Sequence, residues 1–204
     1  MKFLLRVPVS LILCQMKKMV STNSHASIIK QFNRVARLVC FGGSRRTHFM
    51  ITTDEDLTVR PLRVEDAQAL SSLLLAQPPE YTRFFYAFSF AADHIAKMLA
   101  ERGKDIYVGL LWRDELVAFF MLRGWNEGYE VPTLGTFVAE KYRGYGFMQL
   151  TVELTKVICK LRGVSRVMYK SHPDNAPAKK ADVMGFKQAG VDPTTGNLIY
   201  HLDL

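Results

Sequence analysis

A strand, a glycine-containing turn and a long amphipathic helix follow one another in the middle of this chain. Residues 131–138 have the composition of a strand, and apolar residues recur at helical spacing from Phe147 to about Leu161. Between them, Gly144 and Gly146 free the backbone to turn tightly. The unpaired N–H groups and the positive dipole end of the helix face that turn. The arrangement predicts a cradle for a phosphate or a pyrophosphate.

Two other phosphate-binding motifs are excluded by spacing. The turn lacks the Gly-Lys-Ser/Thr sequence of a Walker-type nucleotide loop. A dinucleotide fingerprint needs a third glycine where Gln149 stands, and it belongs to a first β-α-β unit rather than to mid-chain. A Gly-x-Gly turn alone is a weak signal, so the interpretation depends on the rest of the chain.

The remaining segments predict one α/β domain over residues 50–204, with a mixed, mostly antiparallel central sheet flanked by helices. We find no internal repeat and no linker that would divide it. The predicted strands cover residues 57–62, 106–112, 116–122, 131–138, 166–170, 185–187 and 198–202, and the helices cover residues 66–75, 93–102, 147–161 and 176–184.

Charge separates this domain from the segment before it. The 204 residues carry a net charge of +8, yet residues 1–49 hold nine Lys and Arg and no acidic residue. Residues 50–204 hold 18 basic and 19 acidic residues, a net charge of −1. The domain therefore gives no indication of a nucleic-acid or membrane partner.

The basic segment 1–49 fits several roles. It has features of a signal peptide, an organellar transit peptide or a nucleic-acid-binding arm, or it is an extension with Met50 as the working start. Three cysteines without close pairing indicate a reducing compartment, so we expect a cytoplasmic protein, with targeting left open. No Cys or His has metal-site spacing, and no apolar run reaches the length of a membrane span.

The turn resembles the coenzyme loop of the GNAT N-acetyltransferases, Gln/Arg-x-x-Gly-x-Gly/Ala. Residues 143–148 fit it, with Met148 where Gly or Ala is usual, and Glu140 stands where many members have Pro. Residues 59–67 are similar to the family's opening strand and helix, and Asn175 followed by Gly185-Phe186 is similar to its closing signature. The resemblance covers about residues 57–204, in the right order.

The resemblance implies acetyl-coenzyme A as co-substrate and no metal. The pyrophosphate of the coenzyme would lie on the loop amides, and the pantetheine arm would pair with the end of the preceding strand, where an N–H polarises the thioester carbonyl. Asn175 would bond the pantetheine or a neighbouring loop, or it caps a helix from Ala176. The coenzyme-binding residues expected are Phe137, Val138, Arg143, Gly144, Tyr145, Gly146, Phe147, Met148 and Asn175.

The proton-transfer groups are left open. The family often has a Tyr seven residues after the Asn, where this chain has Asp182, and no Tyr occurs between 170 and 199. Glu127 and Glu130 lie where the family often keeps a base, and His172 is of the residue type most often used for proton transfer. The expected catalytic residues are Glu127, Glu130, His172 and Asp182, with Asp174 and Tyr169 as further candidates.

The acceptor is expected to bind residues 77–90 and 123–131, whose many aromatic side chains are equally typical of core. A small-molecule primary amine, such as an amino sugar, is the first expectation, and a protein or peptide N-terminus is the second. A coenzyme-binding module without turnover and a nucleic-acid or membrane adaptor acting through residues 1–49 are the other hypotheses. A homodimer is left open.

Overall fold

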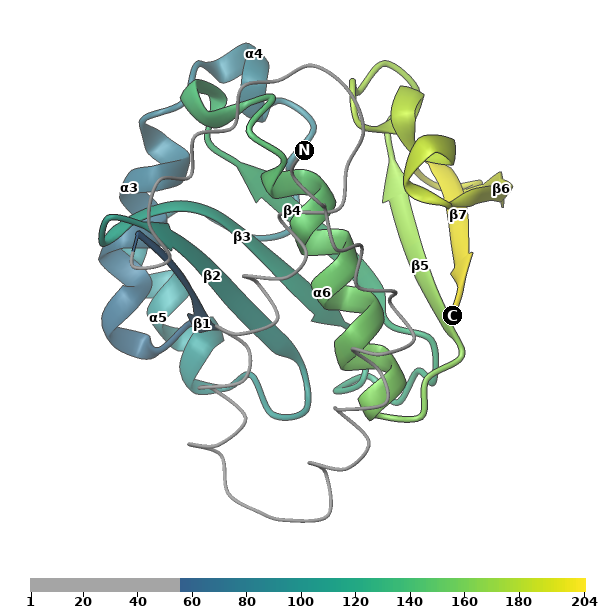
Figure 1. The fold of residues 1–204 in the computed structure, drawn as a ribbon, viewed down its shortest axis with the longest axis horizontal. Helices are drawn as coiled ribbons and strands as arrows, with labels where there is room; N and C mark the ends of the chain where they lie inside the picture. The colour runs from purple at the N-terminus through teal and green to yellow at the C-terminus, as the bar shows by residue number, and fades with distance from the viewer. Residues whose placement is uncertain (1–55) are drawn as a thin grey trace, which may run out of the picture.

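A seven-stranded sheet is the framework of the computed structural model, which describes residues 56–204 (Figure 1). The basic segment 1–49 and its proposed roles lie outside the described residues. The strands are β1 (Leu57–Pro61), β2 (Ile106–Trp112), β3 (Glu115–Arg123), β4 (Thr133–Val138), β5 (Arg166–Ser171), β6 (Lys187–Val191) and β7 (Leu198–Asp203). The α-helices are α3 (Ala67–Leu75), α4 (Pro79–Thr82), α5 (Ala92–Ala100) and α6 (Phe147–Leu161).

The strand order is β1-β2-β3-β4-β5-β7-β6, and every neighbouring pair is antiparallel except β4 and β5. The expected mixed, mostly antiparallel sheet is thus confirmed. The hairpin between β2 and β3 turns through Arg113 and Asp114, whose φ angles are +50° and +64°. Two successive positive φ angles define a type I′ turn, which matches the twist of the two strands.

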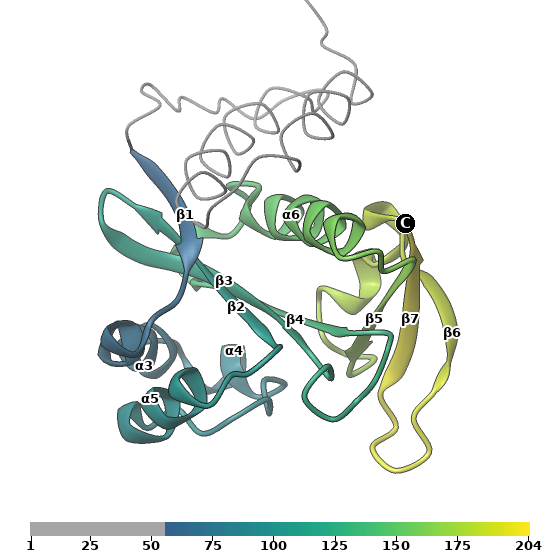
Figure 2. The same cartoon turned by 90° about the horizontal axis from the view of Figure 1, so that it is seen from below.

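Helices cover both faces of the sheet. Figure 2 shows α6 on one face and α3, α4 and α5 on the other. The apolar stripe of α6, including Leu150, Leu154 and Ile158, belongs to one buried cluster, and α3 and α5 pack into a second. Strand β3 lies between the two and is buried from Leu116 to Leu122. Strand β3 is thus covered on both faces by the core.

The predicted helix 176–184 is the main difference from the sequence expectation. Two short 3-10 helices, η3 (Ala178–Lys180) and η4 (Asp182–Met184), stand there instead. Pro177 has no N–H to donate, and Gly185 ends the segment with a φ of +91°. So few residues between a proline and a left-handed glycine do not build a stable α-helix.

The pairing of β4 with β5 is short. Its register contains Thr133 opposite Met168 and Leu134 opposite Tyr169, and then ends. Strand β4 continues to Val138 and β5 to Ser171, and β4 stays paired with β3 along its whole length. The two parallel strands therefore part after Leu134, which leaves the β5-facing edge of β4 without a strand partner over residues 135–138. We call this the free edge of β4.

At the start of the domain, Asp66 accepts three hydrogen bonds. The guanidinium of Arg60 donates two, of 2.6 and 2.7 Å, and the main-chain N–H of Arg63 donates one of 2.8 Å. The bidentate pair lowers the pKa of the Asp66 carboxyl. The pKa of an aspartate in the unfolded chain is about 3.9. A carboxyl whose pKa is lower in the folded protein stabilises the fold fully at pH values above that unfolded pKa. This stabilisation is lost as the pH falls through the lower pKa of the folded state.

We expect Asp66→Asn to lower the free energy of unfolding by about 1–2 kcal/mol at pH 7, because charge-assisted hydrogen bonds are lost. Urea unfolding of both proteins between pH 7 and pH 2 measures this. The difference between them should shrink below pH 4, as the wild-type carboxyl becomes protonated. A difference that stays constant down to pH 2 would contradict the assigned role.

Candidate functional site

Alternation along β4 decides which main-chain groups face its free edge. On the β3 side, the main-chain N–H of Ala139 donates to the carbonyl oxygen of Val117 at 2.9 Å. On the β5 side, the main-chain N–H of Met168 donates to the carbonyl oxygen of Pro132, also at 2.9 Å. Neighbouring residues of a strand direct their polar groups to opposite sides. Thr136 and Val138 therefore direct N–H and C=O groups to the free edge, whereas Phe137 directs its groups to β3.

The glycine turn places further N–H groups next to this edge. Gly146 caps α6 with a φ of +87°, a conformation that costs other residues energy. The first intrahelical bond of α6 runs from Leu150 to Gly146. The N–H groups of residues 147–149 come before it and have no acceptor within the helix. Together with the helix dipole they form an anion-binding end, as the sequence predicts.

Two side chains of the turn take defined positions. Met148 is half-buried and packs against the core cluster of α6, so it is anchored on the protein side of the helix. The group of residue 148 that the first turn of α6 offers to a ligand is therefore the main-chain N–H. Arg143 is exposed, and its guanidinium carbon lies 5.6 Å from the centre of the Tyr81 ring. The charge of Arg143 thus lies beside the turn.

Tyr81 reaches the end of β4 from α4. Its hydroxyl donates to the carbonyl oxygen of Val138 at 2.7 Å, one of the groups on the free edge. Burial raises the pKa of the Tyr81 phenol, so the hydroxyl stays protonated at neutral pH. Tyr81 belongs to residues 77–90, which were expected to bind the acceptor, and its contact with β4 was not predicted. No sequence signal indicates it, because 57 residues separate the two partners.

Aromatic residues after α4 cover one face of the parted strands. The rings of Phe85 and Phe137 are 5.4 Å apart, and those of Phe85 and Phe119 are 5.8 Å apart, so Phe85 belongs to the core. Phe84 instead stacks on the imidazole of His172, with ring centres 4.5 Å apart and planes 14° apart. This stack connects the half of the domain that contains β4 to the end of β5.

His172 lies one residue beyond the end of β5. When the parallel register of β4 and β5 is extended past Leu134, His172 falls opposite Phe137. The main-chain N–H of Asp174 donates to its Nδ1 at 3.2 Å. That bond assigns the neutral tautomer with the proton on Nε2, which makes Nε2–H a donor. Of the expected catalytic residues, His172 is the one that the structure brings to the level of the free edge.

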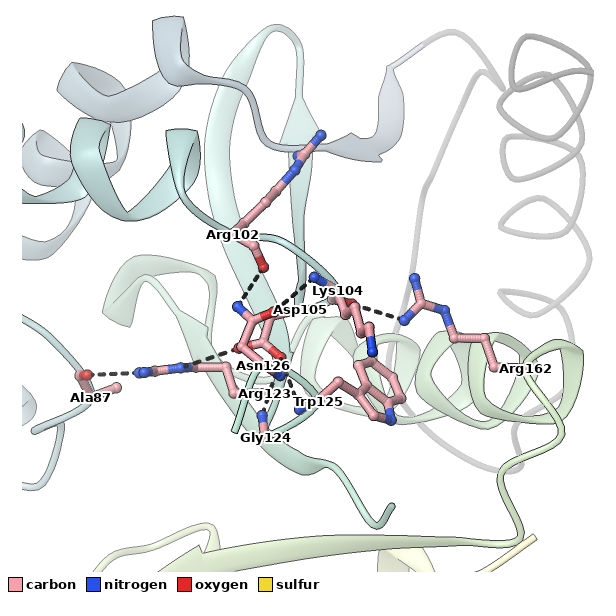
Figure 3. A network of polar contacts seen from close by, with 9 residues as sticks. All are labelled: Ala87, Arg102, Lys104, Asp105, Arg123, Gly124, Trp125, Asn126 and Arg162. Carbon is pink, nitrogen blue, oxygen red and sulfur yellow. Dashed lines mark hydrogen bonds and ion pairs between the residues drawn. The ribbon is translucent and has the colours of Figure 1, made fainter. Parts of the chain in front are cut away.

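Glu127 and Glu130 occupy a different place. Both are exposed in the loop between β3 and β4, which leads into the end of β4 that is still paired with β5. A buried carboxylate holds the start of this loop: Asp105 accepts the N–H groups of Gly124, Trp125 and Asn126, at 3.0 to 3.3 Å (Figure 3). Glu127 and Glu130 are not brought to the free edge of β4.

Arg123 joins that loop to the aromatic segment. Its NH1 donates to the carbonyl of Ala87 at 3.0 Å, and its Nε lies 4.0 Å from the Asp105 carboxylate (Figure 3). Asn126 in turn accepts from the N–H of Lys104 and donates to the carbonyl of Arg102. The two segments expected to bind the acceptor, 77–90 and 123–131, are therefore joined by the hydrogen bond from Arg123 to Ala87.

The remaining expected residues lie after or within β5. Asn175 donates to the hydroxyl of Ser171 at 3.1 Å, so it bonds a neighbouring segment and caps no helix. Asp182 is exposed on η4. Tyr169 is buried against Phe186 and Tyr200, which raises the pKa of its phenol. This packing makes Tyr169 a core residue rather than an exposed acid.

Within residues 56–204, no group of His, Cys, Asp and Glu side chains could hold a metal ion. None of the helices described there is long and apolar enough to cross a membrane.

The comparisons agree with this geometry. A family model described as an acetyltransferase (GNAT) domain matches residues 56–183. An antiparallel-dominated sheet with one parted parallel pair and a glycine turn at a helix end is the fold of the GNAT acyltransferases. The chain belongs to the GNAT acetyltransferase family and is an acetyltransferase.

Solved structures share the fold at low sequence identity. The ribosomal-protein-S5-alanine acetyltransferase from Vibrio fischeri has a TM-score of 0.62 and 16% identity, over 73% of this chain and 93% of that one. PaiA N-acetyltransferase from Thermoplasma acidophilum, in complex with coenzyme A, has a TM-score of 0.61 and 13% identity, over 72% and 99%.

A third structure, RimL, is described as a ribosomal L7/L12 alpha-N-protein acetyltransferase in complex with coenzyme A. It has a TM-score of 0.61 and 14% identity, over 74% of this chain and 95% of that one. A search among curated proteins found no match.

Proposed function

We propose that residues 50–204 transfer an acetyl group from acetyl-coenzyme A to a primary amine. The observation that supports this is the free edge of β4, which ends at the glycine turn and the anion-binding end of α6. These are the two kinds of surface that a pantetheine arm and a pyrophosphate need. The structures of PaiA and RimL with coenzyme A support the same coenzyme class.

The residues fit the coenzyme in two parts. The N–H groups of residues 147–149 and the charge of Arg143 would hold the pyrophosphate. Thr136 and Val138 would pair with the pantetheine amides through their free-edge groups, and Phe137 would support the strand from the β3 side. Gly144 and Tyr145 shape the turn, and Asn175 would fix the segment after β5 through Ser171.

Acetyl-coenzyme A supplies an activated thioester carbonyl when it is bound. A free-edge N–H of β4 would stabilise the negative charge that develops on its oxygen as the amine nitrogen attacks. The new C–N bond replaces the C–S bond, the amine loses a proton, and the leaving sulfur gains one. The proton that the amine loses would pass to the leaving sulfur, and the Nε2–H of His172 would donate a hydrogen bond to that sulfur, because Nδ1 already accepts the Asp174 N–H.

A small primary amine is the first candidate for the acceptor. Aromatic side chains of residues 77–90 and 123–131, among them Phe84 stacked on His172, would contact such an acceptor. A protein N-terminus is the second candidate, supported by the likeness to acetyltransferases described as acting on ribosomal proteins. The cytoplasmic location and the homodimer stay predictions.

We expect Gly146→Ala to weaken the binding of coenzyme A at least tenfold, measured by calorimetry. An alanine in the left-handed conformation costs about 1–2 kcal/mol, so the backbone shifts and the N–H groups of the turn lose their arrangement.

Gly163→Ala is the matched control. Gly163 has a φ of +71°, and a Cβ there would meet no atom within 4 Å. It follows the C-terminal end of α6, so this variant should lose similar stability and keep the affinity of the wild type. Equal affinities for all three proteins would contradict a pyrophosphate site at Gly146.

An acceptor panel tests the reaction itself. Full-length protein with acetyl-coenzyme A should release thiol with one class of primary amine, and amino sugars, small diamines and peptides with free N-termini cover both candidates. Release with small amines alone supports the first candidate, and release with peptides alone supports the second. Coenzyme binding without release from any amine would instead indicate a binding module.

His172→Phe should lower kcat about a hundredfold with the best amine while leaving coenzyme affinity unchanged. The phenyl ring keeps the stack on Phe84 and removes the Nε2–H donor together with the Nδ1 acceptor of the exposed Asp174 N–H. Asp182→Asn, an exposed change on η4, is the comparison and should keep wild-type kcat. Wild-type kcat in His172→Phe would remove His172 from the mechanism.

A further inference from the structure

Two threonine hydroxyls connect β4 to the first turn of α6. The Oγ1 atoms of Thr136 and Thr151 are 3.1 Å apart, and Thr151 Oγ1 also donates to the main-chain oxygen of Met148 at 2.7 Å. A hydroxyl has one proton, and that of Thr151 is used on Met148. The hydroxyl of Thr136 has two acceptors within reach, the hydroxyl oxygen of Thr151 at 3.1 Å and the main-chain oxygen of Phe119 on β3 at 3.4 Å, so these hydrogen bonds connect β3, β4 and the first turn of α6.

The two ends of this connection are the two parts of the coenzyme site. Thr136 directs its main-chain groups to the free edge of β4, and Met148 belongs to the anion-binding turn of α6. Along the chain, the strand and the helix are joined only by residues 139–146, which include two glycines in left-handed conformation. The threonine pair adds a polar contact between strand and helix that does not depend on that turn.

We propose that Thr136 and Thr151 are positioning residues that hold the strand edge and the helix end at the spacing of one coenzyme molecule; this rests on the proposed function. A ligand that spans two surfaces binds more tightly when their spacing is already set, because less ordering accompanies binding. Neither hydroxyl needs to contact the coenzyme for this effect. Thr151 is fully buried, which places its hydroxyl out of reach of ligands.

The chain contains its own control one helical turn further on. Thr155 lies on the same face of α6, is also fully buried, and its Oγ1 has no hydrogen-bond partner within the described part of the chain. Replacing a buried hydroxyl that makes no bond by a methyl group is neutral or stabilising. Thr155→Val therefore reproduces the change in shape and polarity without breaking the connection.

The test compares coenzyme affinities of the full-length variants by calorimetry. We expect Thr151→Val to raise the Kd of coenzyme A about fivefold, a size typical of coupling between two sites. Thr151→Ser should restore the wild-type value, because serine keeps the hydroxyl, and Thr155→Val should match the wild type. The double variant Thr136→Val/Thr151→Val should lose no more than Thr151→Val, since one connection is broken in both.

A fragment ligand separates positioning from general destabilisation. Adenosine 3′,5′-bisphosphate lacks pantetheine, so it uses the helix end without the strand edge, and its affinity should be unchanged in Thr151→Val. Equal losses for both ligands would overturn the proposal and indicate a damaged helix end. Equal coenzyme affinity in Thr151→Val and Thr155→Val would also overturn it. Absence of coenzyme binding by the wild type would overturn the proposed function and this inference together.

Discussion

The hydrogen-bond ladder between β4 and β5 ends after Leu134, and the proposed coenzyme site depends on that ending. Beyond it, β4 keeps one satisfied side against β3 and one side whose N–H and C=O groups need other partners. Such an edge binds an extended, amide-containing ligand as an added strand would. The strand on the other side of β4, β3, is buried on both faces.

The glycine turn brings the helix end to that edge without strain in a side-chain-bearing residue. Gly144 and Gly146 take positive φ angles, so α6 can begin close to Val138. On the opposite face, Tyr81 and Phe84 approach β4 and His172 from α4 and the residues after it. The two faces of the sheet are thus covered by different elements, α6 on one face and α3, α4 and α5 on the other (Figure 2).

Much of the fold followed from local patterns. Alternating strands, the helix at Phe147–Leu161 and the β2–β3 hairpin were predictable because short-range periodicity and turn chemistry specify them. The segment 176–184 was not, since Pro177 and Gly185 limit it to two 3-10 turns. The catalytic candidates also needed the structure: it separated His172 from Glu127 and Glu130, which lie in the loop between β3 and β4.

The sequence by itself determined the family, the single domain and the loop at residues 143–148, because those depend on residue types at fixed spacing. Only the tertiary structure decided that Thr136 and Val138, rather than Phe137, face the free edge, since β-strand alternation fixes direction only once the partner strand is known. It alone revealed the contact of Tyr81 with Val138 and the Thr136–Thr151 pair. Contacts between distant segments depend on packing, which no local pattern encodes.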